Sequence, residues 1–423
     1  MNPEILKLKS IFSKIYSDNN AVQESQLKRY NELANTYKGF FGDQEMQYFS
    51  APGRTEIGGN HTDHNYGRVL AGSINLDSVA IAAPNQSDII TVYSKGYNAP
   101  FRVDLNDLSV KENERETTTA LIRGIAARLK ELGHQIGGFN ACITSDVLPG
   151  SGLSSSASIE VLIGTIFNSL FNEGEIKAEV LAIIGQYSEN NYFGKPCGLM
   201  DQVACAMGGI ITIDFKDPQN PIIKKVDFDF DAQNHNLIVV DTGGTHADLT
   251  DDYASVPTEM KSVAKALGAD VCREISMKDL MNDIGQLRSG TGDRALLRAI
   301  HFIGENDRVV DQVQALERND FPLFLKLVSE SGNSSYKRLQ NIYTVKDQRE
   351  QGVALALALT ENYLKEINAG ACRVHGGGFA GTIQVFLPAN AVDEYTQLME
   401  NVFGENSVYV LKVRQLGTLH LNQ

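Results

Sequence analysis

Residues 148–158 read Leu-Pro-Gly-Ser-Gly-Leu-Ser-Ser-Ser-Ala-Ser, and this stretch decides the fold. The run before it, 139–147, is rich in β-compatible residues, and the run after it repeats Ile, Leu and Phe at helical spacing. The stretch is therefore predicted to join a strand to the start of a helix. Gly150 and Gly152 lack a Cβ atom, so backbone N–H groups can approach an anion closely, and a helix start favours negative charge. We expect a phosphate-binding loop.

The residues around this loop limit what kind of phosphate site it can be. No Gly-Lys-Ser/Thr follows it, which disfavours a P-loop NTPase. Its serine hydroxyls can bind phosphate or a magnesium ion. Taken alone, the stretch also fits a glycine- and serine-rich turn with a serine N-cap, so the choice depends on other segments.

Composition sets the broad class. With 423 residues, 42% of them hydrophobic, the chain is predicted to be globular, with two domains or one large one. A net charge of −14 argues against binding nucleic acid or anionic membranes. Five cysteines without a CxxC pair fit buried thiols in a reducing compartment, and no apolar run reaches the ~20 residues of a spanning helix. We expect a cytoplasmic monomer whose partners are small molecules, with no nucleic acid and no membrane.

The hydrophobic pattern predicts helices and strands in both halves of the chain. Strands are expected at 46–51, 68–74, 78–83, 89–93, 208–213 and 237–241, and helices at 121–132, 176–192, 258–267, 294–318 and 351–367. The polar stretch 216–236 contains two prolines and is expected to separate two domains, 1–225 and 226–423.

A first polar cluster spans residues 53–65, Gly-Arg-Thr-Glu-Ile-Gly-Gly-Asn-His-Thr-Asp-His-Asn. Its glycines and polar residues are unlike a core element. Arg54 can stabilise an anionic neighbour, and Asp63 can accept two hydroxyl hydrogens, which suits a sugar with adjacent hydroxyl groups. A solvated turn is the alternative interpretation.

A second cluster spans residues 189–202 and places two carboxylates on either side of a Gly-Lys-Pro-Cys-Gly bend. Glu189 can bind Mg²⁺ together with a hydroxyl of the phosphate loop, since this cation prefers oxygen ligands. Asp201 can accept the proton of an attacking alcohol. Both carboxylates could instead be ordinary helix-end residues at the surface.

A third cluster, residues 376–381, reads Gly-Gly-Gly-Phe-Ala-Gly and precedes an expected strand. Such a run favours positive φ angles or a close backbone approach. It fits a loop that closes over nucleotide phosphates, although a tight turn before the strand is the alternative.

In this order the three clusters and the phosphate loop resemble the GHMP small-molecule kinases, closest to the galactokinases, over nearly the whole chain. The first cluster resembles the signature Gly-Arg-x-Asn-Leu-Ile-Gly-Glu-His-Thr-Asp-Tyr, and the phosphate loop resembles Gly-Gly-Gly-Leu-Ser-Ser-Ser-Ala-Ser. Residues 197–202 match Cys-Gly-Leu-Met-Asp-Gln. The resemblance implies an α+β GHMP kinase fold of two domains, the first like domain 2 of ribosomal protein S5 and the second ferredoxin-like, with the active site in the cleft between them.

The resemblance also implies ATP- and Mg²⁺-dependent phosphorylation of the anomeric hydroxyl of a hexose, with Asp201 as catalytic base and Arg54 beside it. The implied sugar-binding residues are Arg54, Asn60, His61, Asp63, Gly198, Asp201 and Tyr253. The implied ATP-binding residues are Pro149, Gly150, Ser151, Gly152, Leu153, Ser154, Ser155, Ser156, Ala157, Gly377 and Gly378, and the implied Mg²⁺ ligands are Ser156 and Glu189.

The chain departs from the signature in the first cluster. Where the signature reads Asn-Leu-Ile-Gly-Glu-His, this chain reads Glu-Ile-Gly-Gly-Asn-His over residues 56–61, so Asn60 replaces the Glu expected to bond the sugar 6-hydroxyl. We expect galactose as substrate, with unusual tolerance at carbon 6. A kinase for galacturonate or N-acetylgalactosamine is the alternative within the same chemistry. A regulator that binds sugar and ATP without turnover is disfavoured, because Ser156, Ala157, Glu189 and Asp201 are all present.

Overall fold

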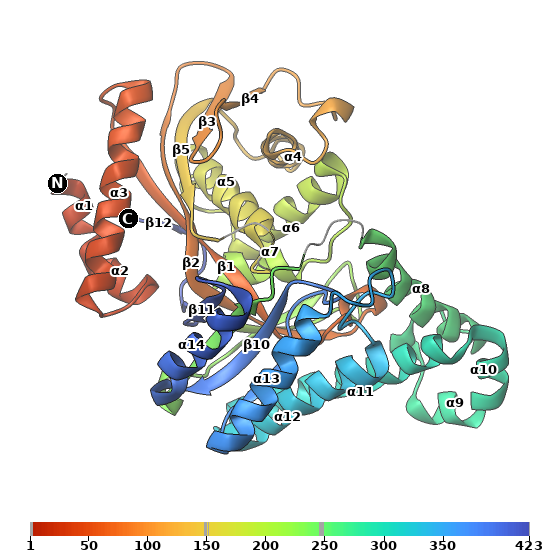
Figure 1. The fold of residues 1–423 in the computed structure, drawn as a ribbon. Coiled ribbons are helices and arrows are strands. Elements are labelled where there is room, and N and C mark those ends of the chain that lie inside the picture. Colours follow the sequence, from red (N-terminus) through yellow and green to blue (C-terminus); the bar gives the residue numbers. More distant parts are fainter. Residues whose placement is uncertain (1–2, 148–149, 151, 245–248, 423) are drawn as a thin grey trace.

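The structure is a computed structural model that describes residues 3–147, 150, 152–244 and 249–422. Within these residues the strands form one eight-stranded and one four-stranded sheet, each covered by helices (Figure 1). The α+β class expected from the sequence is confirmed. No helix in this part of the chain combines the length and apolar character needed to cross a membrane.

The first sheet is built mainly from the N-terminal half. Its main path has the order β12-β1-β2-β5-β3-β4, and β6 and β7 continue from β2. Only β3 and β5 pair in parallel; the other paired strands are antiparallel. The strands are β1 (Gln47–Gly58), β2 (Arg68–Pro84), β3 (Ile89–Ser94), β4 (Phe101–Asp104), β5 (Phe139–Ser145), β6 (Ile210–Asp214), β7 (Ile222–Val226) and β12 (Leu419–His420).

Helices cover both faces of this sheet. The N-terminal helices α1 (Pro3–Lys7), α2 (Lys9–Ile15) and α3 (Asn20–Phe41) pack an aromatic cluster, including Phe12 and Tyr30, against β1 and β2. The larger core includes α4 (Thr118–Glu131), α5 (Ser155–Phe171), α6 (Ala178–Ser188) and α7 (Met200–Met207).

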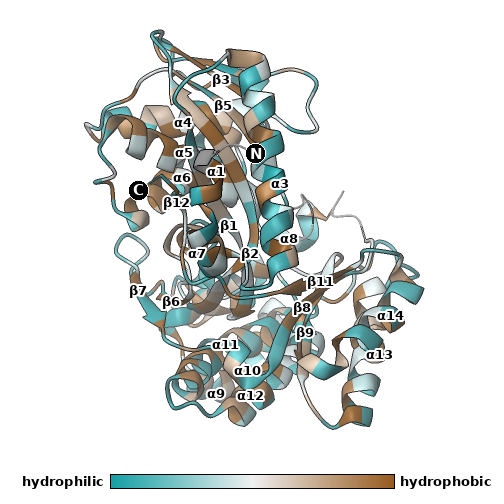
Figure 2. Cartoon of the chain, turned by 90° about the vertical axis from the view of Figure 1, so that its left-hand side faces the viewer, coloured by the Kyte–Doolittle hydropathy of each residue, from teal (hydrophilic) through white to brown (hydrophobic). Residues whose placement is uncertain are grey.

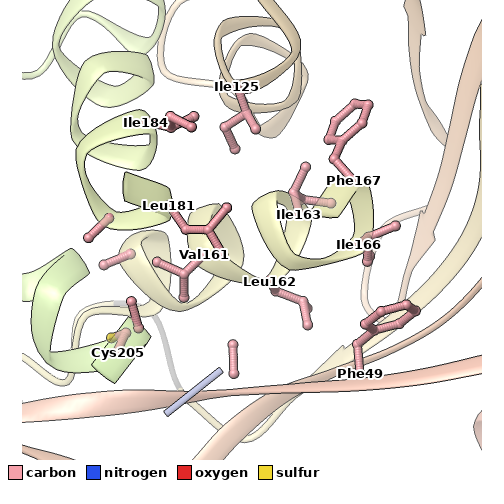
Figure 3. Packing of buried hydrophobic residues seen from close by; sticks show 14 of the residues in the cluster. Phe49, Ile125, Val161, Leu162, Ile163, Ile166, Phe167, Leu181, Ile184 and Cys205 are labelled. Carbon is pink, nitrogen blue, oxygen red and sulfur yellow. The ribbon is translucent and has the colours of Figure 1, made fainter. Parts of the chain in front are cut away.

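Helix α5 runs through the middle of that core. Figure 3 shows Val161, Ile163 and Phe167 of α5 among side chains from α4, α6 and β1. A helix that is apolar on nearly all sides has to be buried, as this one is. Its N-terminus, which follows the phosphate loop, is thereby anchored in this apolar core.

The second sheet has the antiparallel order β11-β8-β10-β9, with strands β8 (His235–Asp241), β9 (Ala371–Val374), β10 (Thr382–Pro388) and β11 (Val408–Leu411). Its neighbouring helices are α8 (Thr250–Ala266), α9 (Met277–Asn282), α10 (Ile284–Thr291), α11 (Asp293–Glu317), α12 (Phe321–Ser334), α13 (Gly352–Ile367) and α14 (Val392–Phe403). Helices α13 and α14 share one apolar cluster with the strands, and α12 packs on β9. Figure 2 shows hydrophobic and hydrophilic residues mixed along these helices, as amphipathic helices require.

Two sequence expectations about the strands were wrong, and a third segment contains a strand that was not expected. Segments 68–74 and 78–83 form one strand, β2, because both halves pair with β1. Residues 53–58, expected to be unlike a core element, belong to the buried strand β1, since their backbone pairs with β2 and their side chains are buried, which also excludes the alternative of a solvated turn. The polar stretch 216–236 contains β7, which is supported by pairing with β6.

The division at residue 225 stays a prediction. It falls within β7, one residue before that strand ends, and β8 begins the second sheet at His235. The C-terminal segment returns to the first sheet, where β12 pairs with β1 through Phe49 and Ser50. A single boundary at residue 225 therefore assigns to the second domain a C-terminal strand, β12, that belongs to the first sheet.

Candidate active site

Arg54 and Asp201 form the ion pair at the centre of the candidate site. Arg54 Nε donates to Asp201 Oδ1 and Nη2 to Oδ2, both at 2.8 Å, so the guanidinium holds the carboxylate with two parallel hydrogen bonds. The Arg54 side chain is 9% exposed and that of Asp201 is 32% exposed. Arg54 thus fixes the orientation of the carboxylate, and part of the Asp201 side chain remains accessible to solvent.

The environment of Asp201 determines its charge. Burial favours the neutral acid, but the Arg54 guanidinium and the Ser154 hydroxyl together hold the pKa of Asp201 below its ordinary value. Asp201 is therefore a carboxylate at neutral pH. It can accept a hydrogen bond from an alcohol and take the proton as that alcohol reacts.

Ser154 connects Asp201 to the phosphate loop. It stands at the N-cap of α5 with a left-handed φ of 61°, yet its hydroxyl does not cap the helix. Instead the hydroxyl donates to Asp201 Oδ2. The first N–H groups of α5 are therefore left without the side-chain acceptor that an N-cap serine normally provides, which suits an anionic ligand.

The phosphate loop has the backbone expected of an anion cradle. Gly150 and Gly152 have φ angles of 80° and 72°, which other residues rarely adopt. Leu153 O accepts from Arg54 N at 3.0 Å, so the loop is attached to β1. Ser155, Ser156 and Ala157 form the first turn of α5. Pro149 and Ser151, also expected to bind ATP, lie outside the described residues.

Glu189 lies beside the first turn of α5. The Ser156 hydroxyl donates to Glu189 Oε1 at 3.2 Å, and Gln202 Nε2 donates to Glu189 Oε2 at 2.9 Å. Glu189 is 3% exposed and sits where α6 gives way to a short π-helical turn. The structure thus brings together the two residues predicted to bind Mg²⁺.

Asp63 and Gly198, both predicted to bind the sugar, are in close contact. A Cβ atom on Gly198 would lie 2.4 Å from Asp63 Oδ2, so only glycine leaves room for the carboxylate. Asp63 Oδ1 also accepts from His64 N at 2.9 Å, which fixes the direction of its side chain.

The third cluster is held through its carbonyl groups. Asn60 Nδ2 donates to Gly376 O at 2.6 Å, His61 Nε2 to Gly377 O at 2.8 Å, and the Tyr253 hydroxyl to Gly378 O at 3.0 Å. Burial lowers the pKa of His61 to about 4, so its ring is neutral and Nε2 carries the hydrogen. Three successive carbonyls are thereby used by predicted sugar-site residues, while no described residue accepts from the N–H groups of Gly376, Gly377 or Gly378.

The expected contact between Asn60 and a sugar is not supported by this geometry. Asn60 is fully buried, and its Nδ2 donates to Glu56 Oε1 at 3.0 Å as well as to Gly376 O. Its Oδ1 accepts from Ser335 Oγ at 3.2 Å and from Asn341 Nδ2 at 2.9 Å. Two donors and two acceptor positions are all an amide has, so none is left for a hydroxyl. The tolerance at carbon 6 derived from a direct Asn60 contact therefore loses its structural basis.

The sequence reasoning missed several partners of the signature strand. Arg373 Nη2 donates to Glu56 Oε1 at 2.6 Å, and Arg373 is fully buried. The Thr55 hydroxyl lies 3.1 Å from His375 Nε2 and accepts from Gln384 Nε2 at 2.7 Å. Arg373 and His375 directly precede the third glycine cluster, so a charged residue in an otherwise apolar strand was the available signal.

Family comparisons agree with this arrangement. The GHMP kinases N terminal domain matches residues 120–209, which include the phosphate loop, Glu189 and Asp201. The galactokinase galactose-binding signature matches residues 35–84, which include Arg54 and Asp63.

Whole-chain comparisons extend the similarity. A galactokinase from Lacticaseibacillus casei is 30% identical over 88% of this chain and 94% of its own length, and the human galactokinase is 28% identical over 90% and 93%. The crystal structure of Lactococcus lactis galactokinase complexed with galactose superposes with a TM-score of 0.79 at 25% identity, covering 92% of this chain and 99% of that one. A mevalonate kinase structure shares the fold, with a TM-score of 0.61 at 17% identity over 86% of this chain and 98% of that one.

Proposed function

This chain belongs to the galactokinase family of GHMP kinases and is a sugar kinase, and we propose that it transfers the γ-phosphoryl group of ATP to the anomeric hydroxyl of galactose, giving galactose 1-phosphate and ADP. The observation that carries the proposal is the position of Asp201. Its partly exposed carboxylate is held by Arg54 and bonded to Ser154, the residue that opens the helix after the phosphate loop. A proton acceptor and a phosphate site are thus joined by one hydrogen bond.

In the proposed reaction the anomeric oxygen forms a bond to the γ-phosphorus while the bond from that phosphorus to the leaving ADP oxygen breaks. The proton of the sugar hydroxyl passes to Asp201. Because Arg54 keeps the pKa of Asp201 low, the carboxylate is a weak base, and the proton moves as the new bond forms rather than beforehand. Phosphoryl transfer relies mainly on alignment and on neutralising charge, so a weak but fixed base is sufficient.

The phosphates of ATP would lie at the N-terminus of α5. The N–H groups of the third glycine cluster, residues 376–381, would face the same phosphates from the opposite side. Both segments combine positive φ angles at glycine with N–H groups that no described residue accepts from. The carbonyl groups of the third cluster are already bonded to Asn60, His61 and Tyr253, which keeps its orientation fixed.

A magnesium ion fits the residues at Glu189 and Ser156. Both supply oxygen, and within the described residues no set of three or more His, Cys, Asp or Glu side chains gathers into a complete metal site. Mg²⁺ commonly takes one or two protein oxygens and completes its shell with phosphate and water. When bound, it would neutralise charge on the phosphates. The cytoplasmic location and the monomeric state stay predictions.

The direct test is product formation. The full chain, incubated with ATP, Mg²⁺ and galactose, should yield galactose 1-phosphate that is identified by ³¹P NMR. Omitting galactose measures ATP hydrolysis alone. A protein that binds galactose and ATP but forms no sugar phosphate would contradict the proposal and favour the regulator.

A further inference from the structure

A second buried carboxylate, Glu160, lies behind the predicted magnesium site. Glu160 follows Ser156 by four residues on α5, so the two side chains share one face of the helix. Glu160 is fully buried, and acidic side chains are rarely so unless they are paired. Within the described residues no Lys, Arg or His side chain forms an ion pair with it.

Gln202 connects Glu160 to Glu189. Its Nε2 donates to Glu160 Oε2 and to Glu189 Oε2, each at 2.9 Å. Both N–H groups of the amide are used in this way, one for each carboxyl group. The orientation of Gln202 therefore decides whether Glu189 faces a donor or an acceptor.

Two oxygen atoms in this group lack a partner. Glu160 Oε1 and Gln202 Oε1 are both buried, and neither takes part in a hydrogen bond with a described residue. A carboxylic acid and a primary amide can form two parallel hydrogen bonds in opposite directions, so one proton on Glu160 would serve both oxygens. Burial and the nearby carboxylate of Glu189 raise the pKa of Glu160 well above its usual range, which agrees with that arrangement.

We propose that Glu160 is a positioning residue that acts through Gln202 to orient Glu189 toward the magnesium ion of MgATP. Glu160 holds the amide with its N–H groups toward the two carboxyl groups, and Glu189 then keeps its other oxygen toward Ser156. A reversed Gln202 would turn its oxygen toward Glu189 and repel it. The inference rests on the proposed function for the role of Mg²⁺.

The test measures binding rather than turnover. Calorimetric titration of the full chain with a non-hydrolysable ATP analogue, with and without Mg²⁺, gives the gain in affinity due to the metal. Glu160→Ala and Gln202→Ala should lose about tenfold or more of that gain, the usual cost of removing a residue that orients a metal ligand. Binding without Mg²⁺ should change little.

Two further variants separate positioning from packing and charge. Glu160→Gln should keep the gain, because its amide can replace a neutral carboxyl as donor and acceptor toward Gln202. Thr165→Val is the matched control: Thr165 is buried on the same helix but bonds Val161 O and Thr418 instead. It should behave as wild type.

Two results would overturn the inference. One is a folded Glu160→Ala whose gain with Mg²⁺ equals that of wild type. The other is a Glu160→Gln that loses the gain, which would mean that a negative charge is required. If Glu160→Ala does not fold, the other two variants still test the inference. A Gln202→Ala that keeps the Mg²⁺-dependent gain in affinity, or a Glu160→Gln that loses it, would then overturn it. No sugar is present, so a wild type that binds MgATP without phosphorylating galactose would count against the proposed function alone.

Discussion

Asn60 Nδ2 lies 3.0 Å from Glu56 Oε1, and these two residues carry the amide and the carboxylate that the galactokinase signature has in the opposite order. The signature reads Asn-Leu-Ile-Gly-Glu, whereas this chain reads Glu-Ile-Gly-Gly-Asn over residues 56–60. One carboxylate is thus retained and moved by four residues. Glu56 is also the only described hydrogen-bond partner of the Arg373 side chain, whose Nε and Nη1 have none.

Restoring only one signature residue should therefore destabilise the protein. Asn60→Glu would bury a second carboxylate next to Glu56 and opposite the Gly376 carbonyl, and Glu56→Asn would leave Arg373 without its counter-charge. Each should lower the free energy of unfolding by about 3 kcal/mol or more, the usual cost of an unpaired buried charge. The double variant keeps one carboxylate and one amide, so it should lose less than the sum. Urea unfolding of all four proteins measures the coupling, and additive losses would contradict it.

Asp201→Asn should lower kcat by ~10²-fold or more, since the amide cannot accept the proton of the attacking hydroxyl. The side chain keeps its size, so the affinity for sugar should largely survive. Steady-state kinetics with galactose and calorimetric sugar binding together check this. A kcat close to that of wild type would remove Asp201 from its proposed role.

The pH profile should depend on Arg54. Arg54 and Ser154 lower the pKa of Asp201 against the effect of burial, so in wild type Asp201 stays ionised as pH falls and should cause no acidic inflection of kcat/KM above pH ~5. In Arg54→Ala the largest effect that opposes burial is lost and the weaker one of Ser154 remains, so the pKa of Asp201 rises and the acidic limb should move to higher pH. Arg54→Lys keeps the charge and should move it less. Equal inflections in all three proteins would show that the ion pair does not set the titration of Asp201.

The phosphate loop and the helix after it could be predicted because their signals are local. Gly150 and Gly152 adopt the positive φ angles that glycine favours, and the apolar repeat after Ser158 matches α5. Asp201 and Glu189 could be singled out because they flank a glycine-containing bend and because residues 197–202 match the motif of the family that the chain resembles.

The surroundings of Asn60 could not be predicted, because they come from distant parts of the chain. Apart from the local Glu56, the partners of its amide are Ser335, Asn341 and Gly376, all more than 270 residues away. Residue pattern alone cannot distinguish an amide that faces a ligand from one that joins two segments. The same holds for residues 53–58, whose polar side chains are tolerated in a buried strand only because partners such as Asp201 and Arg373 meet them.

Removing the predicted metal ligands should change the Mg²⁺ requirement. Glu189→Ala and Ser156→Ala should each raise the Mg²⁺ concentration at half-maximal activity, by about tenfold for the carboxylate, because a charged oxygen ligand contributes more than a hydroxyl. Glu175→Ala removes an exposed carboxylate after α5 and serves as the control. If Glu189→Ala keeps both the half-saturation point and kcat of wild type, Glu189 has no metal role.

The last prediction concerns selectivity at carbon 6 of the sugar. A charge-assisted hydrogen bond from a signature glutamate would contribute about 1.5–3 kcal/mol, equivalent to roughly ten- to a hundredfold in affinity. Position 60 here carries an amide whose polar atoms are all used within the protein, so this contribution is absent. We therefore expect galactose to exceed 6-deoxygalactose in kcat/KM by less than about tenfold, and to exceed glucose by much more because Asp63 remains in place.

The measurement is an ATP-coupled panel of galactose, 6-deoxygalactose, galacturonate, N-acetylgalactosamine and glucose. Glu56→Gln belongs in the same panel, because Glu56 is the carboxylate nearest to Asn60 that could contact carbon 6 instead. If wild type discriminates strongly against 6-deoxygalactose and Glu56→Gln does not, Glu56 has taken over the contact and the expected tolerance is wrong. If Glu56→Gln lowers kcat/KM for galactose and for 6-deoxygalactose by the same factor, Glu56 serves only to hold Arg373. Preference for galacturonate or N-acetylgalactosamine over galactose would keep the kinase chemistry but replace galactose as the substrate.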